Sequence, residues 1–182
     1  MPTIYLVRHG KAAAGFGAHP DPGLDDLGRT QAQATATVLS TLPQMPVYSS
    51  PLARAQETAE PLCKLWGCDY SIEPRVAEIP SPTDDLAERS AWLSAAMAGS
   101  WDTLDASLQA WRAQLGECLL AFKEDVVLFS HYVAINAAVG VALDDSHMVV
   151  FHPDNASVTR LSNDGGELRV VELGGEAATH IN

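Results

Sequence analysis

Ile4-Tyr5-Leu6-Val7-Arg8-His9-Gly10 is the stretch that decides how this chain folds. Its first four residues are a short apolar run with β-branched and aromatic side chains, which predicts a buried strand. The arginine and the histidine follow directly, so they lie at the C-terminal tip of that strand. In open α/β sheets, ligands bind in the crevice at this edge. A guanidinium beside an imidazole there indicates a site for an anion, with phosphate as the first candidate.

A second apolar run, Val126-Val127-Leu128-Phe129, resembles the first and ends in Ser130-His131. If both runs are central parallel strands, their carboxyl ends meet at one edge and the two histidines lie side by side above the sheet. A lone histidine is usually structural or merely exposed. Two histidines at equivalent strand tips favour a functional site.

Arg54 supplies a third element. It lies in 49–55, which follows a short strand at 47–48, so it is expected in the first turn of a helix. Backbone N–H groups and the helix dipole favour an anion there. Alone, Arg54 would be interpreted as a surface helix residue. With Arg8 and the two histidines it forms a chemical set, because arginine forks bind phosphate oxygens and a neutral imidazole can attack phosphorus. Such a set can support phosphoryl transfer without a metal.

Strand and helix signals alternate along the chain, which predicts a single α/β domain over 1–182. We expect a three-layer α/β/α sandwich with a mostly parallel central sheet. Asp25 or Asp26 can cap the first helix, and Pro43 ends it. The expected strands are 3–7, 47–48, 70–72, 126–129, 148–151, 157–161 and 168–171, with a hairpin turn at 163–166. The expected helices are about 28–42, 51–66, 84–98, 103–122 and 132–141.

Composition narrows the function classes. The 182 residues are 47% hydrophobic, which fits a folded domain with a substantial core. The net charge is −12 with only 11 lysines and arginines, which disfavours nucleic acid and anionic membranes as partners. The apolar stretch 126–143 contains Ser130, His131 and Asn136, so a strand followed by a buried helix explains it better than a membrane span.

The cysteines and the N-terminus indicate a cytoplasmic protein. Cys63, Cys68 and Cys118 are an odd count without metal-type spacing, which favours reduced thiols, although a Cys63–Cys68 disulfide is compatible. The first residues enter a strand directly, without a basic segment or a signal-like apolar segment.

Several motifs, in order, resemble those of the histidine phosphatase superfamily, also called phosphoglycerate mutase-like. Arg8-His9-Gly10 is similar to the N-terminal signature, and Ser130-His131 to the second histidine. Residues 24–32 resemble the start of the first helix, 49–59 the second arginine motif, and 155–159 the closing strand. Each motif is weak alone, but the shared order covers most of the chain. The resemblance implies the phosphoglycerate mutase-like fold.

The resemblance also implies roles for individual residues. His9 would be the nucleophile that forms a phosphohistidine, while Arg8, Arg54 and His131 would hold the transferred phosphoryl group. No metal or cofactor is expected. The family uses an acidic residue after the second arginine motif as general acid, which requires a raised pKa. Glu78 is the best match. Its rivals are Glu73, Asp84 and Asp85, and the alternative is that Glu78 is a solvated loop acid.

Three positions depart from the family pattern. Many members have Glu where this chain has Lys11 and Asn where it has Gly15, and glycine is common where it has Tyr132. Lys11 and the short chain favour the small phosphatase branch over the mutases. Lys11 either adds positive charge near the mouth of the site or is solvated. Tyr132 either borders the pocket or, preferably, packs in the core.

The middle helices and the other histidines carry weaker expectations. Residues 84–122 are expected to form a helical lid region over the site. One of Trp92, Trp101 and Trp111 could line a pocket, although aromatic residues at helical spacing are more often core. The remaining histidines are expected at the surface; they are His19, His147, His152 and His180.

The sequence therefore predicts a metal-independent phosphatase that acts on a phosphomonoester, either a small phosphorylated metabolite or a phosphorylated side chain of a protein. The alternatives are a phosphoglycerate-type mutase and a catalytically weak protein that binds a phosphorylated ligand. The sequence does not identify the substrate. An edge strand or a tryptophan-bearing helix could form a homodimer, but no motif indicates either.

Overall fold

The computed structural model describes residues 1–177, which form a six-stranded mixed sheet in the order β3-β2-β4-β1-β5-β6. The parallel part consists of β1, β2, β3 and β4, and β5 and β6 are antiparallel additions beyond β1. The strand bounds are β1 (Thr3–Arg8), β2 (Val47–Ser49), β3 (Ser71–Ile72), β4 (Val126–Ser130), β5 (Val158–Asp164) and β6 (Glu167–Glu172).

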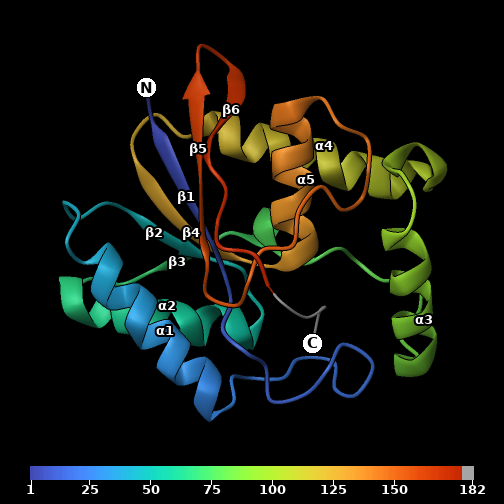
Figure 1. The fold of residues 1–182 in the computed structure, drawn as a ribbon, viewed down its shortest axis with the longest axis horizontal. Coiled ribbons are helices and arrows are strands. Elements are labelled where there is room, and N and C mark those ends of the chain that lie inside the picture. The colour runs from blue at the N-terminus through green and yellow to red at the C-terminus, as the bar shows by residue number, and fades with distance from the viewer. Residues whose placement is uncertain (178–182) are drawn as a thin grey trace.

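Helices cover both faces of the sheet (Figure 1). On one face lie α1 (Asp26–Leu39) and α2 (Ala53–Trp66), and on the other lie α4 (Ala106–Ala121) and α5 (Tyr132–Leu143). The fifth helix, α3 (Leu86–Met97), stands beside the sheet rather than on it. Two short 3-10 helices occur at Pro74–Val76 and Trp101–Thr103. The predicted three-layer α/β/α architecture is confirmed.

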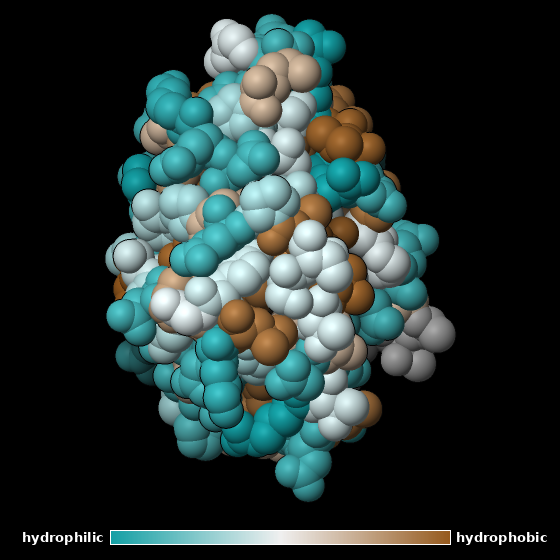
Figure 2. All heavy atoms as spheres, turned by 90° about the vertical axis from the view of Figure 1, so that its left-hand side faces the viewer, coloured by the Kyte–Doolittle hydropathy of each residue, from teal (hydrophilic) through white to brown (hydrophobic). Residues whose placement is uncertain are grey.

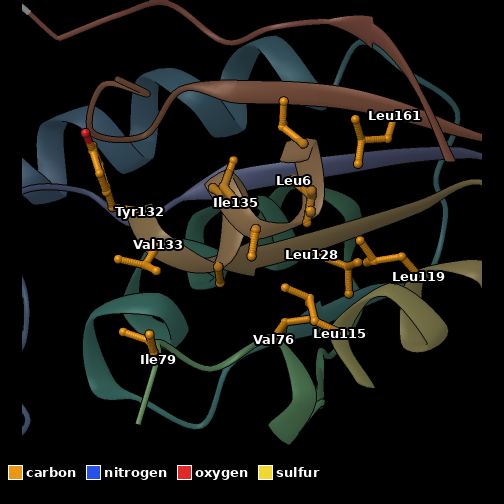
Figure 3. Close-up of a cluster of buried hydrophobic side chains, with 14 of the residues drawn as sticks. Leu6, Val76, Ile79, Leu115, Leu119, Leu128, Tyr132, Val133, Ile135 and Leu161 are labelled. Carbon is orange, nitrogen blue, oxygen red and sulfur yellow. The ribbon is translucent and has the colours of Figure 1, made fainter. Parts of the chain in front are cut away.

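Strand β4 divides the core into its two halves, because successive strand side chains point to opposite faces. Val126 and Leu128 join one buried cluster with residues of α4 and α5, such as Leu115 and Ile135. Figure 3 shows side chains from the strands and from both helices converging in this cluster. Val127 and Phe129 join the second cluster, beneath α1 and α2. Burial on both faces explains why the strand is continuously apolar.

Local signals set several boundaries. The Asp25 side chain accepts a 2.7 Å hydrogen bond from the backbone N–H of Gly28 and caps α1, as one of the two predicted caps. The hairpin between β5 and β6 turns through Gly165 and Gly166, whose φ angles are +67° and +98°. Two successive positive φ angles favour glycine, and they suit the twist of a two-residue hairpin loop. Pro51 lies before α2, which starts at Ala53 rather than at the predicted proline.

The predicted strand at 148–151 is wrong, because this segment is irregular. Its backbone groups find other partners. The N–H groups of Val150 and Phe151 both donate to the side-chain oxygen of Asn136 on α5, at 2.8 and 3.2 Å. The N–H of Met148 donates to the carbonyl of Gly99. A single buried asparagine thus replaces the strand ladder, which apolar patterning cannot reveal.

Helix α5 accounts for the long apolar stretch after β4. Nine of its residues, from Tyr132 to Gly140, are buried between the sheet and its neighbours. Within the described residues, no helix combines the length and the apolar character that crossing a membrane requires. The face in Figure 2 is mostly hydrophilic, with apolar residues in scattered groups.

Truncating a core side chain at the α4–sheet contact is expected to destabilise the fold. Leu115 is 1% exposed, so Leu115→Ala should lower the free energy of unfolding by about 2–5 kcal/mol through lost burial and a cavity. Leu65→Ala, at a helical position that is 50% exposed, is the matched control and should change it by about 0.5 kcal/mol or less. Urea unfolding monitored by circular dichroism measures both, and equal effects would contradict this account of the core.

Candidate active site

The register of β1 and β4 brings two histidines together. Arg8 and Ser130, the last residues of the two strands, are paired across the parallel ladder. The residues that follow them, His9 and His131, therefore extend from the same edge of the sheet. Their ring centroids are 5.2 Å apart, with the rings tilted by 56°. The sequence prediction that both lie side by side at the strand tips is confirmed by this geometry.

The hydrogen bonds of His9 define which nitrogen can react. Its Nδ1 lies 2.6 Å from the carbonyl oxygen of Gly10, an acceptor, so Nδ1 carries the proton. Its Nε2 lies 3.2 Å from Nε of Arg54, a donor, so Nε2 carries the lone pair. Burial, followed by the charges of Arg54 and Arg8, holds the pKa of His9 well below its ordinary value of 6.5. The imidazole is therefore neutral at neutral pH, with its lone pair at Nε2.

Two arginines flank this imidazole. Arg54 lies in the first turn of α2 and is 8% exposed. Arg8 is 2% exposed; its Nη1 donates to the carbonyl of Pro153 at 2.8 Å, and its Nε is buried without a hydrogen-bond partner in the described residues. The Tyr132 ring centroid lies 5.1 Å from the Arg8 guanidinium carbon. Buried cations with a free donor are suited to binding an anion.

Glycine and Thr58 hold the turn after β1 in place. A Cβ on Gly10 would lie 2.5 Å from the carbonyl oxygen of Gly28, so the close packing of this turn on α1 requires glycine. The N–H of Gly10 donates to Oγ1 of Thr58 at 3.0 Å, and that hydroxyl donates to the carbonyl of Arg54 at 2.6 Å. One hydroxyl thus ties the His9 loop to the first turn of α2. Thr58 stood inside a recognised motif, but its role became visible only in three dimensions.

His131 lies beneath the site and is fully buried. Its Nε2 is 2.7 Å from Oγ of Ser50, and its Nδ1 has no partner within the described part of the chain. Burial, then the charges of Arg54, His9 and Arg8, lowers its pKa well below 6.5. His131 therefore offers one uncommitted ring nitrogen next to His9. A narrow pocket, the slot, is lined by residues that include Arg8, His9, Arg54 and Glu78, and His131 is not among its lining residues.

Glu78 faces the arginines and also caps α5. Its two carboxyl oxygens accept hydrogen bonds from the N–H groups of Val133 and Ala134, each at 3.1 Å, and from its own neighbour Ile79 at 3.0 Å. Burial raises the pKa of this carboxyl above 4.5, and these three bonds and Arg54 oppose the rise. A carboxyl with a raised pKa beside a nucleophile has the properties of a general acid.

The three rival acids are placed elsewhere. Glu73 forms an ion pair with Arg75 at 2.8 Å and caps the short helix at Pro74–Val76. Asp85 caps α3 through a 2.9 Å bond from the N–H of Glu88, and Asp84 is exposed. Glu78 is the one of the four that lines the slot.

A third arginine reaches the slot and was not anticipated from the sequence. Arg89 projects from α3 and lines the same slot as Arg8, His9, Arg54 and Glu78. Its guanidinium carbon lies 4.2 Å from the centroid of the Phe16 ring, and its Nε is buried without a partner in the described residues. Nothing in the sequence around Arg89 distinguishes it from a surface helix residue, so only the packing of α3 against the loop after β1 identifies it.

A larger cavity adjoins the slot. It has a volume of about 740 Å³, within the range of small-molecule sites. The slot and the cavity share three lining residues, Phe16, Leu93 and Tyr132, so the two spaces are neighbours. The N-terminal loop supplies one wall and α3 another, and these segments lie near each other in Figure 1.

The structure places Lys11, Tyr132 and the tryptophans among the alternative positions that the sequence allowed. Lys11 pairs with Asp25 at 3.4 Å, at the start of α1, and does not line the slot. Tyr132 packs in the core, as preferred, and it also borders both spaces, so the two alternatives hold together. Trp101 stacks on Trp111 with centroids 5.8 Å apart, and neither borders the slot or the adjoining cavity.

The four remaining histidines differ from one another. His147 is exposed and pairs with Asp145. His19 is exposed and also lines the slot. His152 is exposed, but its Nδ1 lies 2.6 Å from the Tyr132 hydroxyl, a partner that the sequence did not suggest. The prediction for His180 lies outside the described residues.

A buried neutral imidazole between arginines, with a protonatable carboxyl opposite, defines a site for phosphoryl transfer at the edge of an α/β sheet. The chain belongs to the histidine phosphatase superfamily, branch 1, whose family model matches residues 4–175.

Individual relatives agree with this family. A protein of Photorhabdus laumondii described as "Probable phosphoglycerate mutase GpmB" is 28% identical over 162 residues, covering 79% of this chain and 75% of that protein. A Cronobacter sakazakii protein of the same description is 31% identical over 63% of this chain, and the match spans half of its own length.

Solved structures share the fold over nearly all of the chain. A mycobacterial glucosyl-3-phosphoglycerate phosphatase superimposes with a TM-score of 0.75 at 24% identity, over 97% of this chain and 100% of that one. The phosphoserine phosphatase of Entamoeba histolytica, in complex with 3-phosphoglyceric acid, gives a TM-score of 0.75 at 19% identity, over 96% and 98% of the two chains. At these identities the similarity establishes the fold.

Removing the Thr58 hydroxyl is expected to loosen the His9 loop. Thr58→Val keeps the side-chain shape but leaves the buried N–H of Gly10 without its acceptor, which should cost roughly 1–3 kcal/mol of stability. Thr58→Ser retains the hydroxyl and should recover most of this loss. Thermal unfolding of both variants measures the difference. If valine is as stable as serine here, the Gly10–Thr58 bond does not hold the loop.

Proposed function

We propose that this protein is a phosphatase that hydrolyses a phosphomonoester through a phosphohistidine formed on Nε2 of His9. The observation that carries the proposal is the hydrogen-bonding of His9, whose Nδ1 faces a carbonyl and whose Nε2 faces a cation. This arrangement presents a neutral nucleophile to a place where arginines already gather.

The first step forms the phosphoenzyme. The lone pair of His9 Nε2 attacks phosphorus, the N–P bond forms, and the bond from phosphorus to the ester oxygen breaks with its electron pair on that oxygen. Glu78 gives its proton to the departing oxygen, so an alcohol or phenol leaves. The raised pKa of Glu78 supports this role, because the proton is retained to higher pH than on an ordinary carboxyl.

The second step releases phosphate. Water attacks the phosphorus of phospho-His9 while the Glu78 carboxylate takes a proton from that water. The N–P bond breaks, its electron pair returns to Nε2, and inorganic phosphate leaves. Glu78 is then protonated again and His9 neutral, so the cycle closes without another reactant.

Charge on the phosphoryl oxygens is met by the surrounding cations and donors. We assign Arg8 and Arg54, which both line the slot, to the equatorial oxygens. We assign the uncommitted ring nitrogen of His131 to the same group, because its ring centroid lies 5.2 Å from that of His9. Fixed donors of this kind stabilise the transition state because they need not reorganise during the reaction.

We further propose that the chain acts as one domain in which α3, within the predicted lid region 84–122, forms a lid over the slot. The other long helix of that region, α4, packs on the sheet as part of the core and is not part of the lid. Two contacts support this role for α3: Arg89 stacks on Phe16, and a Cβ on Gly17 would lie 2.9 Å from the Ser90 side chain. The lid helix therefore packs directly against the loop after β1, beside the slot.

Phosphatase activity is preferred over phosphoglycerate mutase activity and over binding without turnover. A mutase must hold a charged phosphoglycerate between two transfers, and the described residues that line the cavity beside the slot include no lysine or arginine for a carboxylate. A protein that only binds would not need the protonatable acid that Glu78 offers. We propose a phosphorylated metabolite or phosphoprotein as substrate and a cytoplasmic location, which the three free cysteines support.

Loss of the nucleophile is the primary test. His9→Ala should lower kcat/KM for phenyl phosphate by about 10³-fold or more, because the covalent route is removed. It should also abolish incorporation of labelled phosphate into the quenched protein. His147→Ala, at an exposed site away from the slot, is the control and should behave as wild type. A His9→Ala protein that is folded and active would exclude this mechanism.

The pH dependence tests the acid. The lowered pKa of His9 keeps its lone pair available below pH 6.5, whereas the proton on Glu78 is lost as pH rises through a pKa above 4.5. Activity on phenyl phosphate should therefore be highest on the acidic side of neutrality and decline at higher pH. In Glu78→Gln that decline should flatten, and the rate loss should be smaller with p-nitrophenyl phosphate, whose leaving group needs less protonation.

Ionisation of the substrate's own phosphate, near pH 6, affects the wild type and the variant equally. The comparison between the two proteins therefore isolates Glu78. An unchanged alkaline limb in Glu78→Gln would show that another group supplies the proton.

A further inference from the structure

We propose that the alcohol or phenol released from the phosphomonoester is electrically neutral and largely apolar, and that it is bound in the 740 Å³ cavity beside the slot. This inference rests on the proposed function and specifies its substrate class. It excludes phosphorylated acids and zwitterions, such as phosphoglycerate and phosphoserine, as preferred substrates.

The position of the cavity assigns it to the leaving group. The phosphoryl group occupies the slot with His9 and the arginines, so the rest of the ester must extend through an adjoining space. The cavity adjoins the slot along Phe16, Leu93 and Tyr132, which border both spaces. A group bonded to the phosphoryl oxygen at this border enters the cavity directly.

The lining of the cavity sets the chemistry of that group. Phe16, Leu93, Met97 and Val149 provide an apolar surface, and glycine and alanine residues widen it. Among the described residues that line it, none is an aspartate, glutamate, lysine or arginine. A carboxylate or an ammonium group placed here would lose water without gaining an ion pair with a lysine, arginine, aspartate or glutamate of the lining, which is unfavourable.

Arg89 does not supply a positive charge to the cavity, because it lines the slot and not the cavity. Its guanidinium is stacked on the ring of Phe16, one of the residues that border both spaces. Its positive charge therefore adds to the phosphate-binding set. A carboxylate several atoms away from the phosphorus would lie beyond Phe16, in the apolar space.

The polar side chains of the cavity are few: two serines, Tyr132 and His152. The Ser90 and Ser94 hydroxyls come from α3, and the Tyr132 hydroxyl is bonded to Nδ1 of His152 at 2.6 Å. These groups can orient one or two hydroxyl or carbonyl groups of a neutral ligand. They do not neutralise a charge.

Matched alkyl phosphates test the inference without changing leaving-group reactivity. We would compare kcat/KM for ethyl phosphate, octyl phosphate and the phosphate ester of 8-hydroxyoctanoic acid. Octyl phosphate should exceed ethyl phosphate by about 10-fold or more, because additional methylenes are buried. The terminal carboxylate should remove most or all of this gain. Equal or higher activity on the carboxylate ester would overturn the proposal.

A charge placed in the cavity should reverse the preference. Ser94→Lys introduces an ammonium group on its wall and should shift the ratio of kcat/KM values toward the carboxylate ester by about 10-fold or more. Ala95→Lys is the matched control, since this neighbouring residue is exposed and does not line the cavity. An identical shift in both variants would assign the effect to overall charge and contradict the cavity's role.

Phosphoenzyme formation separates the failure of this inference from failure of the proposed function. If no ester labels His9, the phosphohistidine mechanism is wrong. If all three esters label His9 with similar kcat/KM values, the mechanism holds and the assignment of the cavity to an apolar leaving group is wrong.

Discussion

The parallel pairing of β1 with β4, in the register that sets Arg8 opposite Ser130, is the constraint on which the rest of the site depends. It places His9 and His131 at one edge, and burial on both faces of β4 prevents slippage, because a shift by one residue would exchange its two sets of core side chains. The two helices that follow β2 and β4 then start at the same edge, with Arg54 and Tyr132 in their first turns. The β1–β4 pairing thus sets both the position of the two histidines and the packing of the core.

The electrostatics of the site oppose those of the whole chain. The protein carries a net charge of −12, yet Arg8, Arg54 and Arg89 converge on a slot whose lining includes one carboxyl, Glu78. Burial first, and then the charges of Arg54 and Arg8, lower the pKa of His9 and His131 and keep both imidazoles neutral. The backbone hydrogen bonds and Arg54 favour ionisation of Glu78, and burial outweighs them and raises its pKa. The pKa values of the imidazoles and of the carboxyl are thus shifted in opposite directions at one site, a pattern that separates the base from the acid in enzymes.

Much of this arrangement could be predicted from the sequence, because it follows from short-range signals. The apolar runs, the cap at Asp25 and the order of the motifs indicated the layers, the paired histidines and Arg54. Long-range side-chain contacts could not be predicted in this way. Asn136 replaces a strand ladder at 148–151, and Arg89 reaches the slot only because α3 packs against Phe16. Tyr132 was assigned to the core because apolar patterning cannot show that a buried residue also borders a cavity.

The proposed acid and the proposed leaving-group cavity are built from different parts of the chain: Glu78 is held by backbone groups, and the cavity is lined by side chains. Backbone N–H groups of Ile79, Val133 and Ala134 hold the carboxyl, and a backbone group survives any side-chain replacement except proline. The apolar cavity, in contrast, is shaped by side chains of the loop after β1 and of α3. Mutations can therefore change the shape of the cavity while the backbone hydrogen bonds to Glu78 remain. In evolution, such a division lets one catalytic centre be reassigned among substrates by drift in its surroundings.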